Sequence, residues 1–127
     1  MLPLRHRRLW IVLSGILLAG VVFASLQPNF GPRVPANFDK LEHLAAYVVL
    51  ALWFTGLVVR DRYWTVVVGL LALGASIEVL QGLMNIGRSA EWLDMFANTL
   101  GIGLGLVIAL RVTGDWSRRF ESWLSST

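Results

Sequence analysis

Four long runs of apolar residues alternate along the chain with short polar stretches. The first run, from Leu9 to Leu26, carries no charge. As a helix, at about 1.5 Å per residue, it would rise about 27 Å, which is close to the hydrocarbon thickness of a bilayer. The pattern therefore predicts an all-α integral membrane bundle of four transmembrane helices, with consecutive helices as antiparallel neighbours. The predicted spans are about 9–26, 39–59, 63–84 and 90–112, within a single domain over residues 1–127.

The composition is that of a membrane protein. Hydrophobic residues make up 56% of the 127 residues and charged residues 15%, against roughly 25% charged in an average soluble domain. This balance excludes a disordered chain, a coiled coil and a soluble nucleic-acid binder, although the sequence pI is about 10.2. The chain has no cysteine, which excludes disulfides, cysteine-based zinc sites and thiol nucleophiles.

The charged residues are distributed unevenly between the two sides of the predicted bundle. With the N-terminus inside, eight of the eleven Lys and Arg residues lie on the inner side, and five of the eight acidic residues lie on the outer side. Because positive residues are retained inside, we expect both termini there (N-in/C-in). The start of the chain also fits a signal peptide, but its apolar run is longer than usual for one, which favours an uncleaved first helix.

Aromatic residues lie near the expected ends of the spans. Trp10, Tyr63 and Trp64 at the inner ends, and Trp92 at an outer end, are expected to anchor the helices at the membrane surface. The tail 114–127 would place its aromatic residues on one helical face and its arginines on another, which fits a short interfacial helix. A frayed tail is the alternative.

Polar residues within the second predicted span share one face. Asp39, His43 and Tyr47 follow one another at four-residue intervals, so a helix places them in a row. Asp39 could instead cap this helix, and a hydrogen-bonded structural role is the alternative for His43.

The third and fourth spans also carry polar residues within apolar sequence. Glu78 and Gln81 are three residues apart, and Asp94 and Asn98 are four apart. A carboxylate inside an apolar helix must be paired, protonated or hydrated, so a structural ion pair is the alternative for Glu78. For Asn98 the alternative is an interhelical hydrogen bond.

These groups all fall in the outer half of the predicted bundle, although they come from separate parts of the chain. This shared placement predicts one polar pocket near the outer surface. The expected lining is Asp39, His43, Tyr47, Glu78, Gln81, Arg88, Asp94 and Asn98.

Chemical roles follow from the residue types. Lys40 and Arg88 could hold a phosphate or another anion, with Tyr47, Gln81 and Asn98 as further substrate-binding groups. His43 could act as general acid and base, oriented by Asp39 or Glu78. Together with Asp94, the same His43 and Glu78 could bind a divalent cation.

Small residues recur at every fourth position of the last span. Ala97, Gly101, Gly105 and Ala109 form a stripe that lets another helix approach closely. The neighbour could be a helix of the same chain or of a second copy, in a homo-oligomer.

In these elements the chain resembles the VanZ-like family of small bacterial membrane proteins, named for a member linked to teicoplanin resistance. The resemblance rests on elements that occur in order over about residues 39–109. They are Asp39-Lys40-x-x-His43 with Tyr47, Glu78-x-x-Gln81, Arg88, and Asp94-x-x-x-Asn98-x-x-Gly101. It implies a bacterial inner-membrane protein with an extracytoplasmic polar pocket in a cell-envelope setting, and it does not imply a reaction.

Two functions therefore stay open. The pocket acts on or binds a lipid-linked or phosphate-bearing envelope molecule, or it belongs to a non-catalytic protein that binds membrane components or modulates a partner. A carrier is disfavoured, because the inner halves of the predicted spans carry no ionisable residue to form a polar path.

Overall fold

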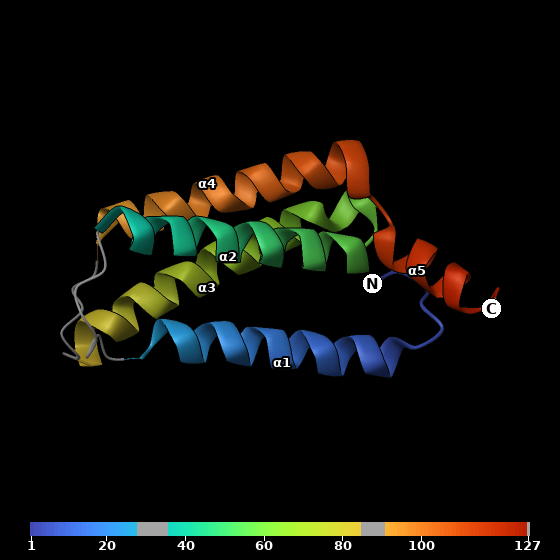
Figure 1. The fold of residues 1–127 in the computed structure, drawn as a ribbon, viewed down its shortest axis with the longest axis horizontal. Coiled ribbons are helices and arrows are strands. Elements are labelled where there is room, and N and C mark those ends of the chain that lie inside the picture. Colours follow the sequence, from blue (N-terminus) through green and yellow to red (C-terminus); the bar gives the residue numbers. More distant parts are fainter. Residues whose placement is uncertain (28–35, 85–90, 127) are drawn as a thin grey trace.

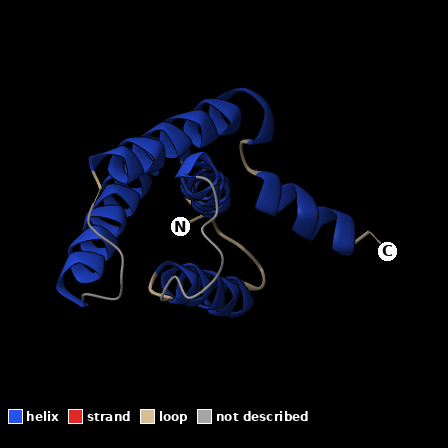
Figure 2. Ribbon diagram, turned by 60° about the vertical axis from the view of Figure 1, so that its left-hand side comes forward, coloured by secondary structure: helices blue, strands red, loops and turns tan. Residues whose placement is uncertain are grey.

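The computed structural model describes residues 1–27, 36–84 and 91–126. Within these ranges the chain is helical and has no strand (Figure 2). The elements are α1 (Arg7–Ser25), α2 (Ala36–Leu57), η1 (Arg60–Arg62), α3 (Tyr63–Met84), α4 (Trp92–Ile108), the π-helical η2 (Ala109–Thr113) and α5 (Trp116–Leu124). Four of the described helices are long and apolar enough to cross a membrane, which confirms the predicted all-α bundle with four candidate spans.

Three helices begin at other residues than expected, and α1 begins at Arg7, two residues before the predicted start. Helix α2 begins at Ala36, three residues before the predicted start, so Asp39 lies in its first turn and is not the N-cap. Helix α4 begins at Trp92, with Glu91 at the N-cap position. The carboxylates of Asp39 and Asp94 therefore both lie in first turns, where the helix dipole favours negative charge.

The closest helix pair is α2 and α4, which run parallel although they are not consecutive (Figure 1). A β-carbon on Gly105 would lie 2.6 Å from the β-carbon of Ala51 and 2.9 Å from the carbonyl oxygen of Val48. Backbones can approach this closely only where side chains are absent. Consecutive helices contact one another as predicted, but the main contact of the bundle, between α2 and α4, was not predicted.

The small-residue stripe of α4 is buried against α2 within one chain. Ala97, Gly101, Gly105 and Ala109 are all buried. This face is therefore already occupied, and a second copy could use it only if α2 and α4 separated. The stripe explains the fold of the single chain.

Helix α1 lies to one side of the other three long helices (Figure 1). Only 11% of an 18-residue apolar stretch of this helix is buried inside the bundle. At its C-terminal end the amide of Gln81 donates to the carbonyl oxygen of Ser25 at 2.7 Å. At its N-terminal end Trp10 is buried. The helix is thus held at both ends, while most of its length is open to the surroundings.

The end of the bundle where α1 begins and α2 finishes is called the aromatic end. The rings of Trp10, Trp53 and Trp116 lie 5.5–5.7 Å apart there, and Phe120 stacks edge-on against Trp10. Trp10 and Tyr63 are 5% and 6% exposed, so their predicted role as membrane anchors is wrong, because they pack against protein. Trp64 and Trp92 are exposed, as an anchor requires.

Helix α5 is fastened to the start of α1 by one carboxylate. Glu121 accepts hydrogen bonds from the backbone N–H groups of Arg5 (2.8 Å) and His6 (3.0 Å) and from the indole of Trp10 (2.8 Å). Partial burial raises the pKa of Glu121, but the donors from His6, Trp10 and Arg5 together bring this pKa below its ordinary value. The tail is thus a docked helix in this structure, and the alternative of a frayed tail is wrong.

Candidate functional site

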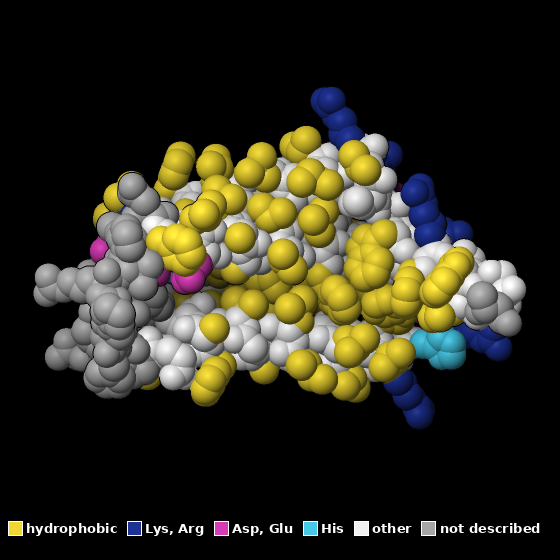
Figure 3. Space-filling view, in the orientation of Figure 1, with side chains coloured by type: hydrophobic (Ala, Val, Ile, Leu, Met, Phe, Trp, Pro, Cys, Tyr) yellow, Lys and Arg dark blue, Asp and Glu magenta, His cyan; other side chains and the backbone are white. Residues whose placement is uncertain are grey.

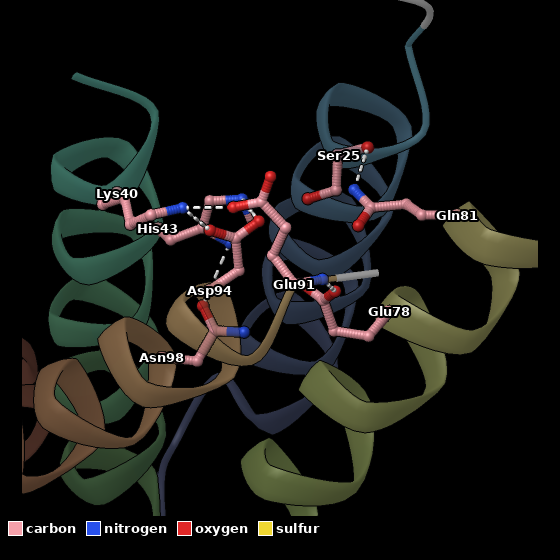
Figure 4. Close-up of polar contacts among 8 residues, drawn as sticks. All are labelled: Ser25, Lys40, His43, Glu78, Gln81, Glu91, Asp94 and Asn98. Atoms are coloured by element: carbon pink, nitrogen blue, oxygen red, sulfur yellow. Dashed lines mark hydrogen bonds and ion pairs between the residues drawn. The ribbon is translucent and has the colours of Figure 1, made fainter. Parts of the chain in front are cut away.

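The polar site lies at the opposite end of the bundle from the tryptophans. Here α1 and α3 finish and α2 and α4 begin, and side chains from α2, α3 and the start of α4 point toward one another (Figure 4). The parallel packing of α2 and α4 brings this about, because it places their first turns side by side.

Lys40 joins α2 to the start of α4. Its ammonium group lies 2.7 Å from Oδ1 of Asp94 and 2.7 Å from Oε2 of Glu91. The Asp94 side chain is 7% exposed and the Glu91 side chain 49% exposed. The bond to Asp94 is therefore the better shielded of the two, and Lys40 is engaged with carboxylates of its own chain.

His43 lies one turn further along α2 and is held between two residues of α4. Its Nδ1 lies 3.1 Å from Oδ1 of Asn98, and its Nε2 lies 3.8 Å from Oδ2 of Asp94. When Nδ1 donates to the Asn98 oxygen, Nε2 faces a carboxylate oxygen, so that two acceptors oppose each other. A proton on Nε2, or a cation between the two groups, relieves this arrangement. The bond to Asn98 also confirms the interhelical hydrogen bond considered for that residue.

Two buried polar atoms near these residues have no hydrogen-bond partner among the described residues. One is Oε1 of Glu78 and the other is the hydroxyl of Tyr47, in side chains that are 7% and 2% exposed. The second oxygen of Glu78 accepts the backbone N–H of Glu91 at 3.1 Å. Because a buried unpaired polar atom costs about 1–3 kcal/mol, both atoms mark places where a ligand or water would gain a hydrogen bond.

The Gln81 side chain is hydrogen-bonded to the end of α1. Its amide nitrogen donates to the backbone carbonyl of Ser25, the last residue of α1 (Figure 4). The final carbonyls of a helix lack partners within the helix, so this bond satisfies one of them. This hydrogen bond therefore links α3 to the end of α1 beside the polar site.

A cavity of about 150 Å³, called here the polar cavity, opens beside this cluster between α1 and α2. Asp39, His43 and Tyr47 all face it, which confirms that the three share one side of α2. Glu42 is a further lining residue that the sequence reasoning missed, although its position three residues after Asp39 was a usable signal. The complete lining is Val21, Ala24, Ser25, Asp39, Glu42, His43, Ala46 and Tyr47.

One group of side chains in the described ranges has the geometry to hold a metal ion. Asp39, His43 and Asp94 each offer one ligand atom, and these atoms lie within 4.8 Å of one another. One imidazole nitrogen and two carboxylates suit Mg²⁺, Mn²⁺ or Zn²⁺. The predicted ligand Glu78 is not in this group, and Asp39 takes its place.

The structure brings together most of the predicted site. Lys40, His43, Asp94 and Asn98 form one connected set of polar contacts. Asp39 and Tyr47 join it through the polar cavity. The predicted phosphate ligand Arg88 lies outside the described residues.

These observations define a helical membrane protein with a buried polar site at one end of its bundle. The family model described as VanZ/LLP1 matches residues 9–113, which include all four candidate spans almost in full. The chain therefore belongs to the VanZ/LLP1 family, and the resemblance seen in its polar motifs is confirmed. No curated protein and no solved structure matches the chain significantly.

Proposed function

We propose that this VanZ/LLP1 family member binds, and acts on, a phosphate-bearing lipid or cell-envelope molecule in the polar site. The observation that carries the proposal is the convergence of buried polar side chains from three helices on one end of an otherwise apolar bundle. Glu78, Asp94 and Asn98 are 7%, 5% and 2% exposed. Ionisable groups at such depth are costly in a membrane and are usually functional.

The site belongs, in this proposal, to the outer leaflet of the bacterial inner membrane, with both termini in the cytoplasm. Arginine side chains gather at the aromatic end of the molecule (Figure 3), whereas the single lysine of the sequence, Lys40, belongs to the polar site. Excess basic charge is retained on the cytoplasmic side of bacterial membrane proteins. A site at the other end then meets molecules on the outer surface, where an effect on teicoplanin susceptibility would arise.

The charge of the site sets a condition on a phosphate ligand. Carboxylates outnumber cations among the described residues of the site, and Lys40 is already paired with Asp94 and Glu91. A phosphate therefore needs added positive charge. A divalent cation on Asp39, His43 and Asp94 would supply it, and Arg88 is a second source in the sequence.

As the alternative to holding a cation, with Arg88 as the source of positive charge, His43 is free to supply acid–base chemistry. Nε2 of His43 faces Oδ2 of Asp94 at 3.8 Å, while Asn98 fixes the other ring nitrogen. This arrangement suits a histidine that takes a proton from water and passes it to a leaving oxygen. The motifs offer no serine or cysteine as an obvious nucleophile, so the step we propose is attack by water on the phosphate ester.

A binding and turnover experiment tests the proposal. Purified protein is given phosphatidic acid, or diacylglycerol as the same lipid without phosphate, in the presence of Mn²⁺. Bound lipid is counted by native mass spectrometry, and free phosphate is assayed. We expect a preference of about tenfold for phosphatidic acid, which His43→Ala and Asp94→Asn abolish. Asp61→Asn, at the aromatic end, is the matched control. Equal binding of both lipids by the wild type contradicts the proposal.

A second candidate is a non-catalytic protein that binds a headgroup or modulates a partner. The contacts of Gln81 with Ser25 and of Lys40 with two carboxylates favour it, because these side chains are used inside the chain. Preferential binding of phosphatidic acid without phosphate release would support this candidate. Metal chelation would then leave the binding unchanged, and Asp94→Asn would weaken it only gradually.

A further inference from the structure

An apolar cavity of about 400 Å³ lies between α1, α2 and α3, separate from the polar site. Its walls include Leu18 of α1, Phe54 of α2 with Val58 just after this helix, and Gly69 and Leu73 of α3. Figure 3 shows hydrophobic side chains along the hollow that runs lengthwise beside α1, with acidic side chains at the end of this hollow near the polar site. The volume falls within the range of about 300–1,000 Å³ that is usual for ligand sites.

The polar and apolar cavities follow the same side of α1. Val21 lines the polar cavity and Leu18 lines the apolar one. Residues three apart lie on one face of a helix in adjacent turns. Both cavities also use α2, through His43 in the polar cavity and Phe54 in the apolar one. A single elongated molecule beside α1 could therefore meet both.

The spacing of the two cavities matches one leaflet of a bilayer. The helix from His43 to Phe54 rises about 16 Å at about 1.5 Å per residue. Half of the bilayer hydrocarbon core is about 15 Å thick. A lipid whose headgroup lies beside His43 would therefore bring the end of its acyl chain to the level of Phe54.

We propose that the apolar cavity between α1, α2 and α3 binds one acyl chain of a membrane lipid whose headgroup occupies the polar cavity. This inference rests on the function proposed above and adds to it the ligand class, an acyl-chain lipid that enters sideways from the bilayer. The low burial of α1 leaves the apolar cavity open for such entry. A soluble phosphate compound has no apolar part that would bind in the apolar cavity.

Gly69 gives a direct test, because it lines the apolar cavity and a β-carbon there meets nothing within 4 Å. Gly69→Leu fills the cavity without a backbone clash. Gly103→Leu is the matched control, since a β-carbon on Gly103 also meets nothing within 4 Å and Gly103 is not part of this lining. The probe is phosphatidic acid with a photoactivatable diazirine in its acyl chain, and crosslinked peptides are identified by mass spectrometry.

We expect crosslinks on the α2 and α3 segments around Phe54 and Leu73. Gly69→Leu should lower them by roughly tenfold, because the side chain displaces several methylene groups of the ligand. Gly103→Leu should leave them unchanged. Crosslinks spread evenly over the exposed faces of α3 and α4, with no effect of Gly69→Leu, overturn the acyl-chain site.

A second probe separates this inference from the proposed function. Diacylglycerol with the same diazirine chain lacks the phosphate. If both probes label the walls of the apolar cavity equally and both labels depend on Gly69, the acyl-chain site stands and phosphate recognition fails. If phosphatidic acid is preferred in native mass spectrometry but Gly69→Leu has no effect on labelling, phosphate recognition stands and the acyl-chain site fails.

Discussion

A β-carbon on Gly101 would lie 2.5 Å from the carbonyl oxygen of Leu44, closer than real β-carbons come to any atom outside their own neighbourhood. This contact fixes the spacing and the register of α2 against α4. It lies next to the pair formed by His43 and Asn98, so the polar site depends on the missing side chain of Gly101.

Gly101→Ala is expected to destabilise the protein by about 1–3 kcal/mol, because α2 and α4 must move apart to admit a methyl group. Thermal unfolding of the purified protein in detergent measures this. Gly103→Ala is the matched control: a β-carbon there meets nothing within 4 Å, and alanine is the better helix former. Equal melting temperatures for the two variants would refute the close packing.

Lys40→Met is expected to lower stability by about 1–3 kcal/mol, because it leaves the buried Asp94 without its cationic partner. Glu91→Gln should have a smaller effect, since Glu91 is half exposed and solvent screens its bond to Lys40. The double variant Lys40→Met/Asp94→Asn should recover part of the loss. Additive losses would show that the pair does not interact.

Mn²⁺ is expected to bind the purified protein and raise its melting temperature, and EDTA should reverse this rise. Asp39→Asn should weaken binding by about tenfold or more, because it removes one ligand atom. Asn98→Ala should weaken it by about 10–100-fold, because the hydrogen bond that Nδ1 of His43 donates to Oδ1 of Asn98 orients the ring. Asp61→Asn at the aromatic end serves as control. Unchanged affinity in Asp39→Asn would exclude the cation site that includes this residue.

Acid is expected to release α5 from the start of α1. The pKa of Glu121 is lower in the folded protein than in the unfolded chain, so its ionised form stabilises the docked helix. That contribution is complete above the unfolded-state pKa and is lost as the pH falls through the folded-state pKa. Indole fluorescence, which reports on Trp10 and Trp116, should change over this range. Glu121→Gln should abolish the pH dependence, and a transition that persists in this variant would assign it to another group.

The sequence predicted the helices well because each span is a continuous apolar run, and in lipid such a run must form a helix to satisfy its backbone. It did not predict that α2 and α4 are the main pair. The glycine stripe showed that some helix comes close to α4, but hydropathy carries no information on which helix that is.

The site was predictable wherever two side chains share one helix. The row of Asp39, His43 and Tyr47 follows from helical periodicity alone. The candidate cation site contains Asp39 where the sequence predicted Glu78. Which of the two carboxylates reaches His43 and Asp94 depends on how α3 is rotated relative to α2 and α4, and periodicity within one helix does not give this rotation. The hydrogen-bond partner of Gln81 could not be predicted either, because it is a backbone carbonyl group and every residue has one.

The parallel pairing of α2 with α4 has a consequence for biosynthesis. Chains are made from the N-terminus, so α2 leaves the ribosome before α4 exists. Until the fourth span is inserted, Lys40 and His43 lack Asp94 and Asn98, the partners they have in the finished bundle. Assembly of the four spans is therefore completed by its last member, and the polar site comes into being only at that step.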